Sequence, residues 1–345
     1  MSSFTDEAAP SAPASILVSG GAGYIGCVLV PKLLALGYRV TAYDLMLFGS
    51  AGLARHPNLR VVQGDIRDRA EMARLLRGQH AVIHLAAIAN DACFELAPQL
   101  ARSINHDCFQ GLVLAARHAG VQRFLFVSDA SVYGRCEQHE SATEAHRLAA
   151  ASDLSKYKAL CESILLAQQG PEFTTTIVRP GLVFGPSPRM RFDLLINGLI
   201  NQACHERKLT ILGGSQFRAS IHVDDLADLC GVLLRAEPEH IAGETFNAVG
   251  ENHTILELAR VVRNVVAAIF PGPESIEVAT QPTRDAPSYR VSGQKLTDRL
   301  GFVARRTVEE ATHELCAAFA AGRYPDSLTG VQYDNAASLR AKRAA

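Results

Sequence analysis

The chain has 345 residues, a formal net charge of −1 and a charged fraction of 20%. A chain of this length can bury a large core, so we expect one large domain or two closely joined domains. The balanced charge, without a long basic run, argues against a nucleic acid or an anionic membrane surface as the main partner.

Eight cysteines are scattered along the chain and form no Cys-x-x-Cys pair. They indicate free thiols in a reducing compartment, and no His, Cys or Asp cluster has metal-ligand spacing, so we predict no metal site. No apolar run has the length of a transmembrane helix, and residues 2–13 lack the basic and apolar regions of a secretion signal. We therefore expect a cytoplasmic protein with no membrane partner, in which residues 1–14 form a disordered tail.

Apolar strands and helix-length segments alternate through the first half of the chain. The strands are nearly continuous apolar runs, which is typical of a parallel sheet covered by helices on both faces. Three of the helical stretches end at glycines, Gly37, Gly78 and Gly120. The pattern predicts a doubly wound parallel α/β sheet of the Rossmann type over residues 15–190. Its expected strands are 16–19, 39–44, 60–63, 81–85, 124–128 and 174–179.

The alternation becomes irregular after Pro180. We expect a smaller C-terminal α/β substrate-binding lobe over residues 191–325, with some return of the chain to the first domain. Residues 326–345 have few apolar anchors and are expected to form a loose tail. The expected elements of the lobe are strands 209–212, 220–223 and 244–247 and helices 224–235, 255–270 and 308–321.

A glycine-rich turn joins the first strand to the first helix. Gly20 allows a tight turn, Gly23 lets the backbone approach a pyrophosphate, and Gly26 lets helix and strand pack closely. Tyr24 and Ile25 lie in the same turn. Because a strand precedes the glycines and a helix follows them, the segment predicts a dinucleotide-binding site.

Two acidic residues follow the next strands. Asp44 ends the second strand, eighteen residues after Gly26, where its carboxylate would accept hydrogen bonds from ribose hydroxyls and repel a 2′-phosphate. The cofactor predicted is therefore NAD, not NADP. Asp65 and Ile66, after the third strand, would lie beside the adenine, although a solvent-facing aspartate in a turn explains Asp65 equally well.

Further motifs extend the pattern over most of the chain. With them the sequence resembles the extended short-chain dehydrogenase/reductase family, specifically its NAD-dependent sugar-nucleotide epimerase/dehydratase branch, from about residue 16 to residue 321. The motifs that carry the resemblance are Gly20–Gly26, His84–Ala87, Asn105, Ser131–Gly134, Lys158, Arg179–Gly181 and Arg218 with the following His222–Asp225.

The resemblance implies roles for these residues. Lys158 would hydrogen-bond the nicotinamide ribose, and Arg218 would bind a substrate diphosphate, which suits its planar guanidinium; a solvated surface arginine is the alternative for Arg218. Relatives often dimerise through two long helices, here 95–118 and 154–169, so we expect a homodimer. The further cofactor-binding residues are Leu85, Ala86, Ala87, Asn105, Ser128, Pro180 and Leu182, and the further substrate-binding residues are Tyr133, Arg189 and Arg284.

Three residues depart from the family pattern. Leu154 stands where the family has its catalytic tyrosine, four residues before Lys158. Asp129 stands where a serine or threonine is usual. Pro287 replaces a second diphosphate-binding arginine in many relatives, and the nearby Arg284 is a candidate to compensate.

Leu154 has no proton to exchange, and losing general acid–base help costs a factor of about 10²–10⁴ in rate. A buried carboxylate is a usable base, so Asp129 is the first candidate to replace the tyrosine, with Ser131 beside it. Tyr157, on the same helix, is the second candidate. Alternatively, Asp129 only pairs with Lys158. His84 and His222, at strand edges, are expected to be structural.

These observations favour an NAD-dependent enzyme that modifies a nucleotide-linked sugar by epimerisation, dehydration or oxidation. Its chemistry would begin with hydride transfer from a sugar carbon and would use a non-standard acid or base. An alternative is a binding or sensing protein that keeps NAD without catalysis. A third possibility is that Leu154 and Asp129 were introduced into an ordinary enzyme by engineering.

Overall fold

The structure is a computed structural model that describes residues 14–50, 52–136, 140–273, 275–283 and 288–344. The expected disordered tail falls almost entirely outside these residues, as do Arg284 and Pro287. No helix within the described ranges is both long enough and apolar enough to cross a membrane.

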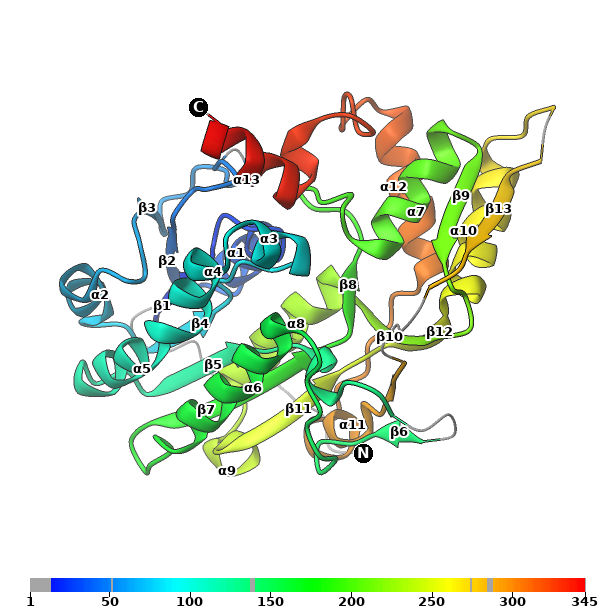
Figure 1. Cartoon of the computed structure of the whole chain (residues 1–345). Helices are drawn as coiled ribbons and strands as arrows, with labels where there is room; N and C mark the ends of the chain where they lie inside the picture. Colours follow the sequence, from blue (N-terminus) through cyan, green and yellow to red (C-terminus); the bar gives the residue numbers. More distant parts are fainter. Residues whose placement is uncertain (1–13, 51, 137–139, 274, 284–287, 345) are drawn as a thin grey trace.

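Seven parallel strands form the central sheet, in the order β11-β7-β5-β4-β1-β2-β3 (Figure 1). The order reverses direction at β1, which is the point where a doubly wound sheet opens a crevice at the carboxyl ends of its strands. The predicted Rossmann architecture is confirmed. The strands are β1 (Ser15–Ser19), β2 (Arg39–Asp44), β3 (Leu59–Gln63), β4 (Ala81–His84), β5 (Arg123–Val127), β7 (Thr174–Pro180) and β11 (Glu244–Ala248).

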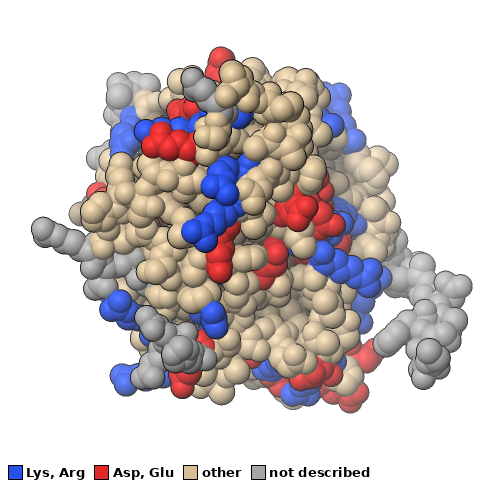
Figure 2. All heavy atoms as spheres, turned by 90° about the vertical axis from the view of Figure 1, so that its right-hand side faces the viewer, with Lys and Arg blue, Asp and Glu red and all other residues tan. Residues whose placement is uncertain are grey.

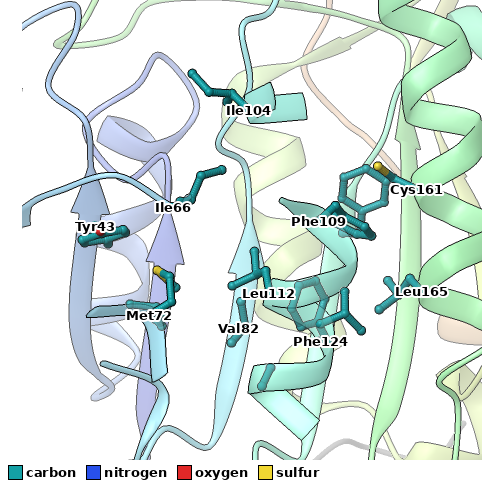
Figure 3. Packing of buried hydrophobic residues seen from close by; sticks show 14 of the residues in the cluster. Tyr43, Ile66, Met72, Val82, Ile104, Phe109, Leu112, Phe124, Cys161 and Leu165 are labelled. Atoms are coloured by element: carbon teal, nitrogen blue, oxygen red, sulfur yellow. The ribbon is translucent and has the colours of Figure 1, made fainter. Parts of the chain in front are cut away.

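Helices cover both faces of this sheet, because successive residues of each central strand are apolar and point to opposite sides. In β1, Leu17 enters one buried cluster and Val18 enters the other. Figure 3 shows the first of these clusters, which Phe109 and Phe124 help to fill. The helices on this face are α2 (Arg69–Leu76), α5 (Phe109–His118) and α6 (Asp153–Leu166), and those on the other are α1 (Gly26–Ala35) and α8 (Val223–Arg235).

The rest of the chain forms small sheets beside the carboxyl ends of the central strands (Figure 1). Basic and acidic side chains lie interspersed among uncharged ones on the face that Figure 2 presents. The small sheets comprise β12 (Glu251–Thr254), β10 (Phe217–His222) and β8 (Leu182–Phe184); β13 (Glu277–Gln281) and β9 (Lys208–Leu212); and β14 (Arg290–Val291) and β6 (Ser141–Ala142). The helices are α7 (Leu195–His205), α9 (Pro238–Ile241), α10 (Ile255–Ile269), α11 (Gln294–Leu300) and α12 (Val308–Ala320).

The expected helix over residues 95–118 is broken. Pro98 lacks a backbone N–H and begins a new helix, where a missing donor costs least. The chain then passes through a π-helical turn that contains Asn105. The resulting elements are α3 (Asp91–Leu96), α4 (Pro98–Arg102), η1 (Ser103–Asp107) and α5.

The expectation of a loose C-terminal tail is wrong. After a 3-10 turn, η3 (Val331–Tyr333), the chain forms α13 (Asn335–Ala344), which packs against α3 (Figure 1). Tyr333, Ala336 and Leu339 are buried. Their spacing of three residues places them on one side of the segment, so a few apolar side chains are enough to hold it.

A buried ion pair joins α6 to β7. Arg179 meets the Glu162 carboxylate with Nη2 at 2.6 Å from Oε2 and Nε at 3.0 Å from Oε1. Ser128, just after β5, donates its hydroxyl to Glu162 at 2.5 Å. Arg179 also donates to the Tyr133 hydroxyl at 2.7 Å, which in turn donates to Asn247 of β11 at 2.7 Å. Side chains from α6, β7, β11, the end of β5 and the turn that contains Tyr133 therefore meet at one set of buried polar groups.

We predict that Glu162→Ala lowers the free energy of unfolding by about 3–5 kcal/mol, because it leaves the Arg179 charge buried without a partner. Urea denaturation measures the change. The exposed Glu172 provides the matched control, since Glu172→Ala is expected to change stability by no more than about 0.5 kcal/mol. A Glu162→Ala loss as small as that of the control would contradict the assigned role.

Candidate cofactor and active site

A pocket opens at the carboxyl ends of the central strands, around the turn between β1 and α1. Most of the predicted cofactor residues line it. They are Gly20, Gly23, Tyr24, Ile25, Gly26, Asp44, Asp65, Ile66, Leu85, Ala86 and Ala87. Other lining residues include Phe48, Arg189, Arg191 and Asn335.

Two glycines of the turn, Gly20 and Gly26, leave no room for a side chain. A Cβ on Gly20 would lie 2.6 Å from the backbone nitrogen of Ala86, and Gly20 has a φ of +78°. A Cβ on Gly26 would lie 2.5 Å from the carbonyl oxygen of Gly20. A Cβ on Gly23 would meet the same carbonyl oxygen at 3.2 Å and no other atom of the described residues within 4 Å. Gly20 and Gly26 thus let the turn pack tightly against its neighbours, and Gly23 leaves the backbone without a side chain. This arrangement fits the close approach of a bound dinucleotide.

Two backbone hydrogen bonds hold the Asp44 carboxylate at the end of β2. Oδ2 accepts from the N–H of Ala22 at 3.1 Å, and Oδ1 accepts from the N–H of Met46 at 2.8 Å. Burial raises the pKa of Asp44. Asp65 also borders the pocket, but it forms an ion pair with Arg67 at 2.5 Å, and hydrogen bonding to Arg67 lowers its pKa.

The other predicted cofactor residues do not border this pocket. Asn105 pairs with the backbone of Ile88, accepting at 2.9 Å and donating at 3.0 Å, and so supports the loop that lines it. Ser128 is engaged with Glu162. Pro180 ends β7 and Leu182 begins β8.

Lys158 is buried beside the end of β5. Its ammonium donates to the carbonyl of Val127 at 2.8 Å and lies 4.8 Å from the centre of the Phe126 ring. Burial lowers its pKa, and the charge of Asp129 opposes that shift.

Asp129 begins the 3-10 turn η2 (Ala130–Tyr133), where Oδ1 accepts from the N–H of Ser131 at 2.7 Å. Burial raises its pKa, while the hydrogen bonds from Ser131 and the charge of Lys158 act in the opposite direction. The two described side chains, Asp129 and Lys158, influence each other without a direct ion pair.

Leu154 and Tyr157 lie on α6 with surroundings that differ from those of Lys158. Leu154 is half-buried and packs against the core cluster below the helix. The Tyr157 ring stacks on Phe94 with centroids 6.0 Å apart and lies 5.3 Å from the ring of His106. Tyr157 therefore faces α3 and η1, whereas Lys158 faces the end of β5.

The three predicted substrate residues that the structure describes have different partners. Arg218 donates to the carbonyl of Phe217 at 2.9 Å, and its guanidinium carbon lies 5.4 Å from the centre of the Tyr289 ring. Tyr133 is only 1% exposed, and its hydroxyl is held in the buried network by Arg179 and Asn247. Arg189 borders the cofactor pocket instead.

Asn335 and Tyr289 are among the residues of the site for which the sequence predicted no role. Asn335 of α13 borders the cofactor pocket, and only the spacing of the apolar residues around it hints that its segment is ordered. Tyr289 is buried against Ala130 and Val132 of η2, and its pKa is raised by burial and by the charge of Asp129. It brings a phenol close to the loop that carries Asp129.

The two histidines have structural partners, as predicted. His84 Nδ1 lies 2.7 Å from the Ser19 hydroxyl, and burial lowers its pKa to about 3. His222 accepts from the backbone N–H of Asp224 at 3.1 Å and caps α8.

A parallel Rossmann sheet with a tight glycine turn and an acid at the end of β2 defines a dinucleotide-binding protein. Residues 16–249 match the NAD dependent epimerase/dehydratase family. The chain belongs to this family, within the extended short-chain dehydrogenase/reductases, and its cofactor is NAD.

Individual relatives agree with this assignment. The chain is 31% identical to the low-salt glycan biosynthesis protein Agl12 of Haloferax volcanii, covering 89% of this chain and 98% of that protein. It is 29% identical to a UDP-glucose 4-epimerase of Yersinia pestis, covering 86% and 94%. Among solved structures it resembles DesIV, a dTDP-glucose 4,6-dehydratase of Streptomyces venezuelae with NAD bound, with 26% identity, a TM-score of 0.79 and coverage of 90% and 98%.

We predict that NAD binds more tightly than NADP, and that Asp44→Ala narrows the difference. The variant loses a charged hydrogen-bond acceptor for the ribose, worth about 1.5–3 kcal/mol of NAD binding, and removes the repulsion of a 2′-phosphate. Calorimetric titration of both dinucleotides tests this, with the exposed Asp298→Ala as control. Equal affinities in the unaltered protein would refute the role of Asp44.

Proposed function

We propose that the protein is an NAD-dependent enzyme that modifies a nucleotide-linked sugar, of the epimerase, dehydratase or oxidoreductase type. The observation that carries the proposal is the family match combined with a pocket built around the glycine turn and Asp44. The names of the UDP-glucose 4-epimerase and the dTDP-glucose 4,6-dehydratase support a nucleotide-linked sugar as substrate.

In the proposed reaction, bound NAD supplies an acceptor for a hydride and can return it. Asp129 takes the proton of the sugar hydroxyl, because Leu154, at the position of the family's tyrosine, has no group that exchanges a proton. Lys158 contributes a positive charge that stabilises the ionised form of Asp129. Arg218 binds the substrate diphosphate through its guanidinium.

We also propose that residues 15–190 form the NAD-binding domain and residues 191–325 most of a substrate-binding lobe, with β11 returning to the central sheet. The protein is proposed to be a cytoplasmic homodimer.

A binding or sensing role without catalysis is the rival function. Adding UDP-, dTDP- and GDP-linked sugars to the protein with bound NAD separates the two. Reduction of the nicotinamide, followed by its absorbance, supports the enzyme. No reduction and no sugar product with any of them would favour the rival.

Asp129→Asn is expected to lower turnover by about 10²–10⁴-fold, because the amide keeps the shape of the carboxylate but does not take a proton. The affinity for NAD is expected to remain unchanged in calorimetry. In the unaltered enzyme the base is active when ionised, so turnover falls as the pH falls through the pKa of Asp129. Because burial raises that pKa, this loss begins above the ordinary aspartate value of about 3.9.

Leu154→Tyr is the complementary variant, since it restores the family's Tyr-x-x-x-Lys. If Asp129 is the working base, this variant gains little and Asp129→Asn remains inactive. A large gain would mean instead that the natural chain is impaired at this position. Should Asp129→Asn retain full activity, the base is another group, and Tyr157→Phe and Tyr289→Phe are the next variants to compare.

We predict that Arg218→Ala weakens the binding of a nucleoside diphosphate by about 1.5–3 kcal/mol, the size of a hydrogen bond to a charged group, and leaves the binding of NAD unchanged. Titration with UDP and dTDP, in the presence of saturating NAD, measures the effect. The exposed Arg260→Ala serves as control. Equal affinities in the variant and the unaltered protein would remove Arg218 from the substrate site.

A further inference from the structure

Arg189 is a buried cation with unused donors. Its side chain lies in the wall of the cofactor pocket, and the residue is only 8% exposed. Neither Nε nor Nη1 has a hydrogen-bond acceptor among the described residues. Buried polar groups normally have partners, and an unpaired buried donor on a charged group is costly. Unpaired N–H groups on both Nε and Nη1, in a residue that lines a pocket, are therefore a sign of a ligand that supplies acceptors.

The rest of the guanidinium is held in place from two sides. Nη2 donates to the side-chain oxygen of Asn335 in α13 at 2.5 Å, and the guanidinium carbon lies 4.8 Å from the centre of the Phe48 ring. A planar group that is fixed in this way presents its remaining donors in a set direction.

The backbone places this arginine beside the glycine turn. The N–H of Arg189 donates to the Ser187 hydroxyl at 3.3 Å, and that hydroxyl donates to the carbonyl of Tyr24 at 2.8 Å. Tyr24 lies immediately before the first turn of α1, whose N-terminal N–H groups carry the positive end of the helix dipole.

The charged side chains near Arg189 do not neutralise its positive charge. Asp193, the nearby acid, is already paired with Arg191 at 2.7 Å. Asp44 attracts Arg189 across the pocket without forming an ion pair, and Arg191 repels it. Burial lowers the pKa of Arg189 to about 10, so the group remains charged at neutral pH.

We propose that Arg189, oriented by Asn335 of α13, binds the diphosphate of the dinucleotide cofactor together with the glycine turn. A phosphate offers several oxygens to a guanidinium, which suits two parallel donors. The C-terminal helix is thereby part of the cofactor site, although it lies well beyond the residues 16–249 that match the family. This role differs from the substrate contact expected from the sequence.

Calorimetry on the full chain with NAD, ADP and adenosine tests the proposal. Arg189→Ala is expected to weaken the binding of NAD and of ADP by a similar factor, about 10- to 100-fold, because charge-assisted hydrogen bonds are lost. The affinity for adenosine is expected to remain unchanged. Arg189→Lys keeps the charge without the fork and is expected to lose less. The exposed Arg260→Ala is expected to bind all three ligands normally.

Two results would overturn the proposal. One is unchanged NAD and ADP binding in Arg189→Ala, and the other is an equal loss for adenosine, which would assign Arg189 to the nucleoside. A selective loss of NADP binding would also count against it, because it would assign Arg189 to a 2′-phosphate.

A second measurement does not depend on the fold tolerating Arg189→Ala. Asn335→Ala keeps Arg189 and removes the hydrogen bond that helps to orient its guanidinium. This variant is expected to bind NAD and ADP several-fold more weakly and to bind adenosine with unchanged affinity. Hydrogen exchange of residues 331–342 is expected to slow when NAD binds to the unaltered protein and to respond less in Asn335→Ala. Exchange that is indifferent to NAD in both proteins would show that α13 takes no part in cofactor binding.

Discussion

The buried pair between Glu162 and Arg179 is the contact on which the geometry of the site depends. It fixes α6 against β7, and the hydroxyl of Ser128 adds the end of β5 to the same contact. Lys158 lies one helical turn before Glu162, and Asp129 directly follows Ser128. Of the two groups proposed for the chemistry, Lys158 is thus attached to a member of this pair and Asp129 to the serine that hydrogen-bonds to it. Because the Glu162 carboxylate accepts from Ser128 and from two nitrogens of Arg179, its position is determined by neighbours at the end of β5 and in β7.

Much of the fold follows from local patterns in the sequence. Near-continuous apolar strands alternating with helices define the parallel sheet, and the turn from Gly20 to Gly26 requires glycine for reasons visible in the chain itself. The interrupted helix after residue 95 was harder to foresee, because a proline can either begin a helix or end one. The side chain of Asn105 reaches Ile88, a contact that has no local signature.

The contacts of the candidate site that the sequence did not predict share one physical origin. Tyr133 follows a strand like a substrate-side residue, yet its hydroxyl is taken up by Arg179 and Asn247, which come from distant parts of the chain. Arg189 and Asn335 are 146 positions apart, so neither residue on its own indicates the other. The segment after residue 326 has few apolar side chains, and its order depends on where those few are placed. Local sequence predicts strands, turns and helix ends well, whereas the partners of polar side chains are decided by tertiary contacts.

The contact between Arg189 and Asn335 also bears on the order in which the protein assembles. Closing a loop of this length costs more entropy than forming the sheet or the glycine turn, whose contacts join nearer parts of the chain. The β1–α1 turn can therefore take its shape before the wall formed by α13 is added. α13 is held by a few hydrogen bonds and a short row of apolar side chains. It is therefore the part of the pocket best suited to local opening while the central sheet stays folded. Detachment of this one helix would then widen the cofactor pocket on the side of Asn335 without unfolding the sheet.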